Sequence, residues 1–131
     1  MSQENVDGFG EGIETFNRND TEGVLRGMDP EVRFEHRLAE LQGKFIGVEA
    51  VRSCLADLDD YFEPGRIDCS DIRDLGDRVL ALGTVCAIGR ESGVETELPY
   101  TVVATFRNGL ITDFTDYGDR TKALEAAGLR E

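Results

Sequence analysis

The chain has 131 residues and a formal net charge of −13 at pH 7, from 27 acidic and 14 basic side chains. So acidic a chain is not expected to bind nucleic acid or an anionic membrane surface, because binding to either requires a basic face that neutralises phosphates. The length fits one domain, and 40% hydrophobic residues are enough to form a core. We therefore predict a single domain over residues 1–131, with neither nucleic acid nor membrane as partner.

In the first half, apolar residues recur at steps of three and four over residues 6–16, which predicts an amphipathic helix. Asp20 or Thr21 can cap a second, short helix, which Asp29-Pro30 ends. Residues 32–37 alternate between apolar and polar side chains, as a half-buried strand does. A polar stretch follows, and a third helix is predicted over residues 48–62.

The second half predicts strands, with Asn108-Gly109 as a strong hairpin signal. Four strands and a closing helix are expected over 67–75, 79–90, 94–107, 110–117 and 121–127. Helices followed by a run of strands predict an α+β fold, with the helices packed in the concave face of a curved, mostly antiparallel sheet. Such a sheet forms a cone-shaped α+β barrel, whose open end is a natural pocket for a small molecule.

Two titratable side chains lie on strand faces that alternation turns inward. His36 is the single histidine and shares a face with Phe34, so it could carry a proton near neutral pH. Asp116 shares a face with Phe114, and a carboxylate there must be paired, protonated or directed into a polar cavity. If the two meet, they form an acid/base pair. The alternatives are a structural histidine and an ion pair of Asp116 with Arg107 or Arg120.

Tyr100 has the same strand parity as the inward Val102, so its hydroxyl could stabilise a developing oxyanion. The alternative is a core tyrosine with a solvated tip. Apolar and small residues on the inward faces, together with an aromatic residue at the end of the third helix, are predicted to line the pocket. These ligand-binding candidates are Phe16, Phe34, Tyr61, Gly83, Val102 and Phe114.

The opposite face of the strand over 79–90 is also apolar, and it suggests a homodimer because an exposed apolar strand face would be adhesive. That row consists of Leu80, Leu82, Cys86 and Ile88. The odd number of cysteines, without close spacing, indicates free thiols and a cytoplasmic location. One histidine with scattered thiols does not make the usual zinc site, and dinucleotide, nucleotide and serine-hydrolase motifs are missing, so we predict no metal and no cofactor.

Three stretches carry a family resemblance: FNRNDTEGVLRGMDPEVRFEH at 16–36, GKFIGVEAVRSCL at 43–55 and FRNGLITDFTDYGDRTKALEAAGL at 106–129. They resemble the nuclear transport factor 2-like superfamily, in its SnoaL-like and limonene epoxide hydrolase-like branch. The resemblance implies the cone-shaped fold, within a superfamily that hosts isomerases, cyclases, dehydratases and epoxide hydrolases as well as non-catalytic proteins.

The site residues of two relatives are mostly replaced here. Gly12 and Val102 match the two oxyanion donors of the ketosteroid isomerases, and His36 matches their general base. Gly83 and Val85 match the Arg and the first Asp of the limonene epoxide hydrolases, whose second Asp is matched by Asp116. The resemblance therefore implies neither of these two activities for this chain.

These observations lead to one principal hypothesis and two alternatives. The principal one is a protein that binds a small, largely apolar organic molecule without a cofactor and, if catalytic, moves protons with His36, Asp116 and Tyr100 in an isomerisation, cyclisation or dehydration. The first alternative is a ligand-binding protein without catalysis. The second is a protein-interaction module whose cone is filled by side chains.

Overall fold

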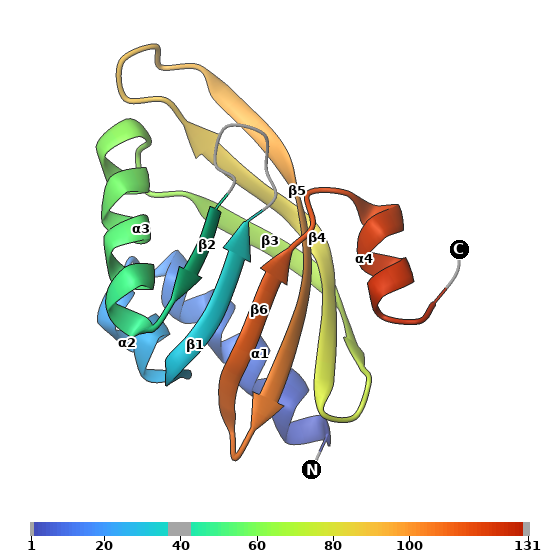
Figure 1. The fold of residues 1–131 in the computed structure, drawn as a ribbon. Coiled ribbons are helices and arrows are strands. Elements are labelled where there is room, and N and C mark those ends of the chain that lie inside the picture. The colour runs from blue at the N-terminus through green and yellow to red at the C-terminus, as the bar shows by residue number, and fades with distance from the viewer. Residues whose placement is uncertain (1, 37–42, 130–131) are drawn as a thin grey trace.

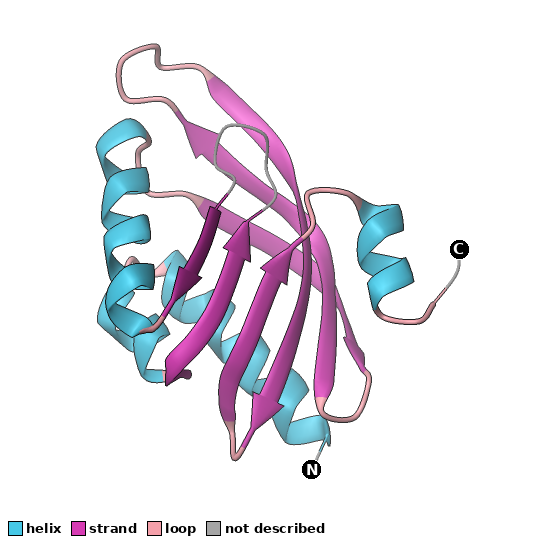
Figure 2. Cartoon of the chain, viewed as in Figure 1, coloured by secondary structure: helices cyan, strands magenta, loops and turns pink. Residues whose placement is uncertain are grey.

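The computed structural model describes residues 2–36 and 43–129, which form a curved sheet with helices on both of its faces (Figures 1 and 2). In chain order the elements are α1 (Ser2–Asn17), α2 (Thr21–Arg26), β1 (Met28–His36), β2 (Gly43–Ile46), α3 (Val48–Tyr61), β3 (Arg66–Asp74), β4 (Arg78–Ile88), β5 (Glu95–Arg107), β6 (Leu110–Asp116) and α4 (Arg120–Ala126). The predicted α+β class is confirmed. The strand β2 was not predicted, because its four residues lie in a stretch that we interpreted as polar.

The sheet has six strands in the order β2-β1-β6-β5-β4-β3. All neighbours are antiparallel except β1 and β6, which run parallel. The sheet is strongly curved but stays open, with β2 and β3 as its edges, so it is a cone-like sheet rather than a closed barrel. Its concave face is covered by α1, α2 and α3, as the sequence predicted, and α4 lies on the opposite face (Figure 1).

Two apolar clusters follow from this layering. The larger cluster fills the concave face between the sheet and α1, and it includes Phe9, Phe34, Tyr100, Val102 and Phe114. The smaller cluster lies between the opposite face and α4; it consists of Leu80, Leu82, Val103, Ala123, Leu124 and Ala127. The predicted strand parity is thus correct. However, α4 of the same chain covers Leu80 and Leu82, so these two residues no longer argue for a homodimer.

Side-chain hydrogen bonds fix α1 and α2 in place. Asn17, at the end of α1, donates from Nδ2 to the Ile67 carbonyl oxygen at 2.9 Å and accepts from the Ile67 amide at Oδ1 at 2.8 Å. It therefore pairs with the β3 backbone much as another strand would. Of the two predicted caps of α2, Asp20 is the one found, and it accepts from the Gly23 amide at 2.9 Å.

Gly83 has a structural role on β4. The register of β3 with β4 shifts between Asp68 and Asp71, and this bulge lies against Gly83. A Cβ atom on Gly83 would collide with the Asp68 carbonyl oxygen. The residue is therefore small because the β3 backbone occupies the space, and not because a cavity is needed there.

Candidate functional site

Asp116 is a carboxyl group buried at the end of β6, with only 1% of its surface exposed. It lies opposite Val102 of β5 and two residues after Phe114, so strand alternation puts it on the concave face. Its Oδ1 atom accepts from the Gly118 amide at 3.1 Å, the Thr101 hydroxyl at 3.3 Å and the Thr101 amide at 3.4 Å. Oδ1 is thus held by three donors. Among the described residues, none donates to Oδ2.

The local sequence explains this arrangement. The ladder between β5 and β6 ends at the pair of Val102 and Asp116, and the Tyr117 amide still donates to the Thr101 carbonyl at 2.9 Å. The chain then turns at Gly118, which has a φ of 70°. Because β6 separates from β5 at this point, no carbonyl oxygen of β6 accepts from the Thr101 amide, which donates instead to the Asp116 side chain. An Asp followed two residues later by Gly is a signal for such a turn.

Burial raises the pKa of Asp116 above its ordinary value of 3.8, and this effect outweighs the hydrogen bonds from Gly118 and Thr101, which lower it. Within the described part of the chain, Asp116 forms no ion pair with a basic side chain. The alternative of an ion pair with Arg107 or Arg120 therefore has no support. A buried carboxyl group without a cation partner favours its protonated form.

Tyr100 lies on β5 beside this carboxyl group and is 7% exposed. Burial, and after it the neighbouring charges of Asp116 and Cys69, raise the pKa of its phenol well above the ordinary value of 10.0. No hydrogen bond to its hydroxyl is found among residues 2–36 and 43–129. The hydroxyl thus remains a neutral donor, as the oxyanion hypothesis requires.

His36 is the residue of β1 that pairs with Asp116 in the parallel register of β1 and β6. The two backbones are therefore neighbours, as the predicted pair requires. The side chain of His36 lies outside the described residues, so its contact with Asp116 stays a prediction. Two residues earlier the same register pairs Phe34 with Phe114, whose rings stack with centroids 4.7 Å apart.

The structure brings together only some of the predicted ligand-binding residues. Phe34, Val102 and Phe114 are buried in the concave cluster, and Phe16 is partly buried against it. Gly83 lies under the β3 bulge, and Tyr61 is 70% exposed at the end of α3. Thr101 and Gly118, which hold Asp116, were not among the predicted residues.

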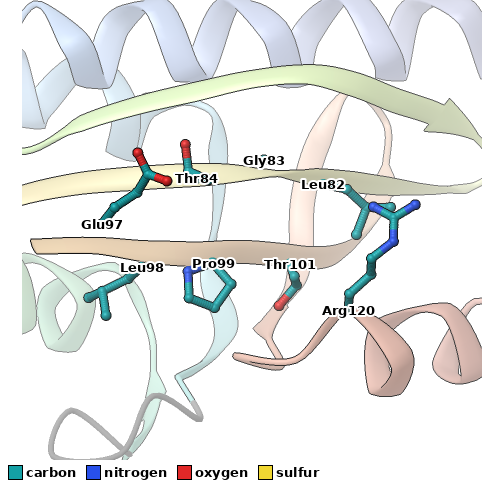
Figure 3. Close-up of a pocket in the computed structure, with 8 residues that line it drawn as sticks. All are labelled: Leu82, Gly83, Thr84, Glu97, Leu98, Pro99, Thr101 and Arg120. Atoms are coloured by element: carbon teal, nitrogen blue, oxygen red, sulfur yellow. The ribbon is translucent and has the colours of Figure 1, made fainter.

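A pocket that the sequence analysis did not anticipate lies on the opposite face of the sheet (Figure 3). Its volume is about 310 Å³, and residues of β4, β5 and α4 form its walls. The lining residues are Leu82, Gly83, Thr84, Glu97, Leu98, Pro99, Thr101 and Arg120. Thr101 therefore reaches both sites, since its hydroxyl also donates to Asp116.

Among the residues that the structure describes, no group of three or more His, Cys, Asp and Glu side chains is placed to hold a metal ion. None of the helices described is long and apolar enough to span a membrane. The three cysteines are free thiols, as predicted.

Residues 10–114 match the SnoaL-like domain family. The chain belongs to this family. Among curated proteins, none matches the chain.

Several solved structures are similar to this SnoaL-like protein. One is a nuclear transport factor 2-like protein of unknown function from Burkholderia pseudomallei, 26% identical, with a TM-score of 0.82 and coverage of 95% of this chain and 97% of the other. A second is TerC, co-crystallised with polyporic acid, 25% identical, with a TM-score of 0.80 and coverage of 95% and 98%. A third is a candidate polyketide cyclase from Xanthomonas campestris pv. campestris, 24% identical, with a TM-score of 0.77 and coverage of 96% and 98%.

Proposed function

We propose that this SnoaL-like protein binds a small, largely apolar organic molecule against the concave face of its sheet, with one polar group of the ligand at Asp116. The observation that carries the proposal is the buried Asp116 carboxyl group, whose Oδ2 has no donor among the described residues. Burying such a group is unfavourable unless something satisfies it, and the Phe34 and Phe114 rings on the same face suit an apolar ligand.

The proposed chemistry is proton transfer without a cofactor. A carboxyl group whose pKa is raised keeps its proton to a higher pH than an ordinary carboxyl group does, and it can deliver that proton to a ligand oxygen. His36, its register partner, would accept or return a proton, and the Tyr100 hydroxyl would donate a hydrogen bond to the oxygen on which negative charge develops. Isomerisation, cyclisation and dehydration of a carbonyl compound are reactions of this type.

Similarity to TerC supports a ligand of this kind, because that protein was crystallised with polyporic acid. The proposal also includes the homodimer and the cytoplasmic location expected from the sequence.

The test is thermal unfolding of the purified protein with polyporic acid and a panel of apolar ketones, lactones and epoxides. A compound at 100 times its Kd should stabilise the fold by about 2.7 kcal/mol, which raises the Tm of a chain this long by roughly 10 °C. Asp116→Asn should reduce this shift strongly.

Asp113→Asn is the matched control, because Asp113 lies on the same strand but forms a surface ion pair with Arg33. A compound that stabilises the wild type and both variants equally would contradict the proposed role of Asp116. Binding without conversion of any compound would favour the ligand-binding protein over the enzyme.

A further inference from the structure

The C-terminal end of α3 is joined to the hairpin that β4 and β5 form. Phe62, the residue after α3, makes an isolated antiparallel bridge with Gly89, the residue after β4. Beside this bridge the Glu63 amide donates to the Ile88 carbonyl oxygen at 2.8 Å. Two segments that are far apart in the sequence are therefore held side by side (Figure 1).

Arg90 strengthens this contact with its backbone and its side chain. Its amide donates to the Tyr61 carbonyl oxygen at 3.0 Å. Its guanidinium group donates from Nε to the Asp59 carbonyl oxygen and from Nη2 to Asp59 Oδ1, the latter at 3.1 Å. The last carbonyl groups of a helix have no partner inside it, and a cation there is favourable. Arg90 thus caps α3 from the hairpin. Residues 59–63 and 88–90 are called the α3–hairpin junction below.

The junction lies at the same end of the sheet as the candidate site. The strands β1 and β6 end at His36 and Asp116. In Figure 1 these strand ends, the C-terminal end of α3 and the hairpin all lie toward the top. The helix α3 packs on β1 and β2, and the junction connects it to β4 and β5 in the other half of the sheet. It therefore joins the two halves across the concave face.

The contacts of the junction are weaker than those within the sheet. A single bridge joins α3 to the hairpin, whereas β4 and β5 pair along the whole of β4. The side chains of Arg90 and Asp59 are 42% and 64% exposed, so their ion pair adds little stability. Segments with exposed hydrogen bonds and little buried apolar surface are those that open locally while the rest of a protein stays folded.

We propose that the α3–hairpin junction is a gate to the concave face, which Arg90 holds closed. When the bridge breaks, the end of α3 moves away from the hairpin and a ligand can reach Asp116; when it forms again, the ligand is covered. Tyr61 and Val94 are exposed apolar side chains at the gate, since the Val94 carbonyl oxygen accepts from the Gly89 amide. The passage of a ligand rests on the proposed function, but the opening itself does not.

A native cysteine can report the opening without any ligand. Cys54 of α3 is buried in the concave cluster, so a thiol reagent reaches it only when the structure opens. Cys86 serves as the reference, because it alternates with Leu82 on the opposite face of β4. The experiment measures the rate at which N-ethylmaleimide labels each cysteine, by mass spectrometry of peptides. Arg90→Gln should raise the rate at Cys54 by about fivefold, because that rate follows the open population, and should leave Cys86 unchanged.

A disulfide across the bridge should have the opposite effect. The hydrogen bonds on either side make Phe62 and Gly89 a non-hydrogen-bonded antiparallel pair, whose Cα atoms are about 4.5 Å apart and within the range of a disulfide. A Cβ atom on residue 89 requires only that the Ser92 hydroxyl turn away. Oxidised Phe62→Cys/Gly89→Cys should label at Cys54 more slowly than the wild type, and reduction should raise the rate again.

Arg33→Gln is the matched control, because it removes an exposed ion pair with Asp113 on the sheet and should leave the rate at Cys54 unchanged. Circular dichroism checks that every variant is folded. A rate at Cys54 that is unchanged in either Arg90→Gln or the oxidised double variant would overturn the gate. Equal acceleration in Arg90→Gln and Arg33→Gln would also overturn it, since a general loss of stability would then be the cause. The absence of any thermal shift with the compound panel would overturn the proposed function alone.

Discussion

Asn17 should contribute measurably to stability, because it joins the end of α1 to the backbone of β3. Its two hydrogen bonds with Ile67, at 2.9 and 2.8 Å, would both be lost in Asn17→Ala. A typical intramolecular hydrogen bond contributes about 0.5–1.5 kcal/mol net, and a buried amide left without a partner costs more. Because Ile67 is buried, we expect a loss of about 2–3 kcal/mol.

Thermal unfolding followed by circular dichroism measures this loss. With an unfolding entropy of about 2.1 cal/mol/K per residue, the expected loss lowers the Tm by roughly 7–11 °C. Gln3→Ala is the control, because Gln3 lies on the same helix and its one hydrogen bond, to Asp7, is exposed. That variant should stay within about 0.5 kcal/mol of the wild type. If Asn17→Ala unfolds at the same temperature as Gln3→Ala, the bridge to β3 does not hold α1.

Three further predictions concern residues of β4, β5 and β6. Folding raises the pKa of Asp116 above 3.8, so ionising this carboxyl group destabilises the folded wild type as the pH rises through and above that value. Asp116→Asn cannot ionise, and its stability relative to the wild type should therefore increase with pH, by about 1.4 kcal/mol per unit of pKa shift. Chemical unfolding at several pH values measures this difference, and a stability of Asp116→Asn that falls relative to the wild type as the pH rises would contradict the prediction. Thr101→Val removes a donor to the carboxylate, so the pKa of Asp116 measured by carbon-13 NMR should rise further; an unchanged value would mean that the 3.3 Å contact is not a hydrogen bond in solution. Gly83→Ala should lower the free energy of unfolding in urea by about 1–3 kcal/mol, since its Cβ would collide with the Asp68 carbonyl. An unchanged free energy of unfolding would show that the β3 bulge moves to accommodate the methyl group.

Strand periodicity was enough to predict which side chains face inward. Tyr100, Val102 and Phe114 are on the concave face because β5 and β6 alternate without interruption where these residues lie. The strand β2 escaped prediction since its four residues include Gly43 and Lys44 and are too few to show a period.

The surroundings of Asp116 could be predicted only in part. Its position on an apolar face follows from strand alternation. The role of Thr101, however, depends on the residue at which β6 separates from β5. That residue is set by the register between the two strands, which the sequence of one strand does not specify. Gly83 was interpreted as pocket lining because small residues leave space, whereas the β3 bulge fills that space. The pocket beside Arg120 depends on the placement of α4 over the sheet, which local patterns do not specify.

We propose above that the ligand lies on the concave face beside Asp116. Amide NMR spectra of nitrogen-15-labelled protein, recorded during titration with polyporic acid and then with the compound of the panel that raises the Tm most, test this directly. The amides of Thr101, Tyr117 and Gly118 surround the carboxyl group, so their signals should shift in the wild type and much less in Asp116→Asn. Shifts confined to Thr84 and Glu97, or no shift with either compound, would contradict this position of the ligand.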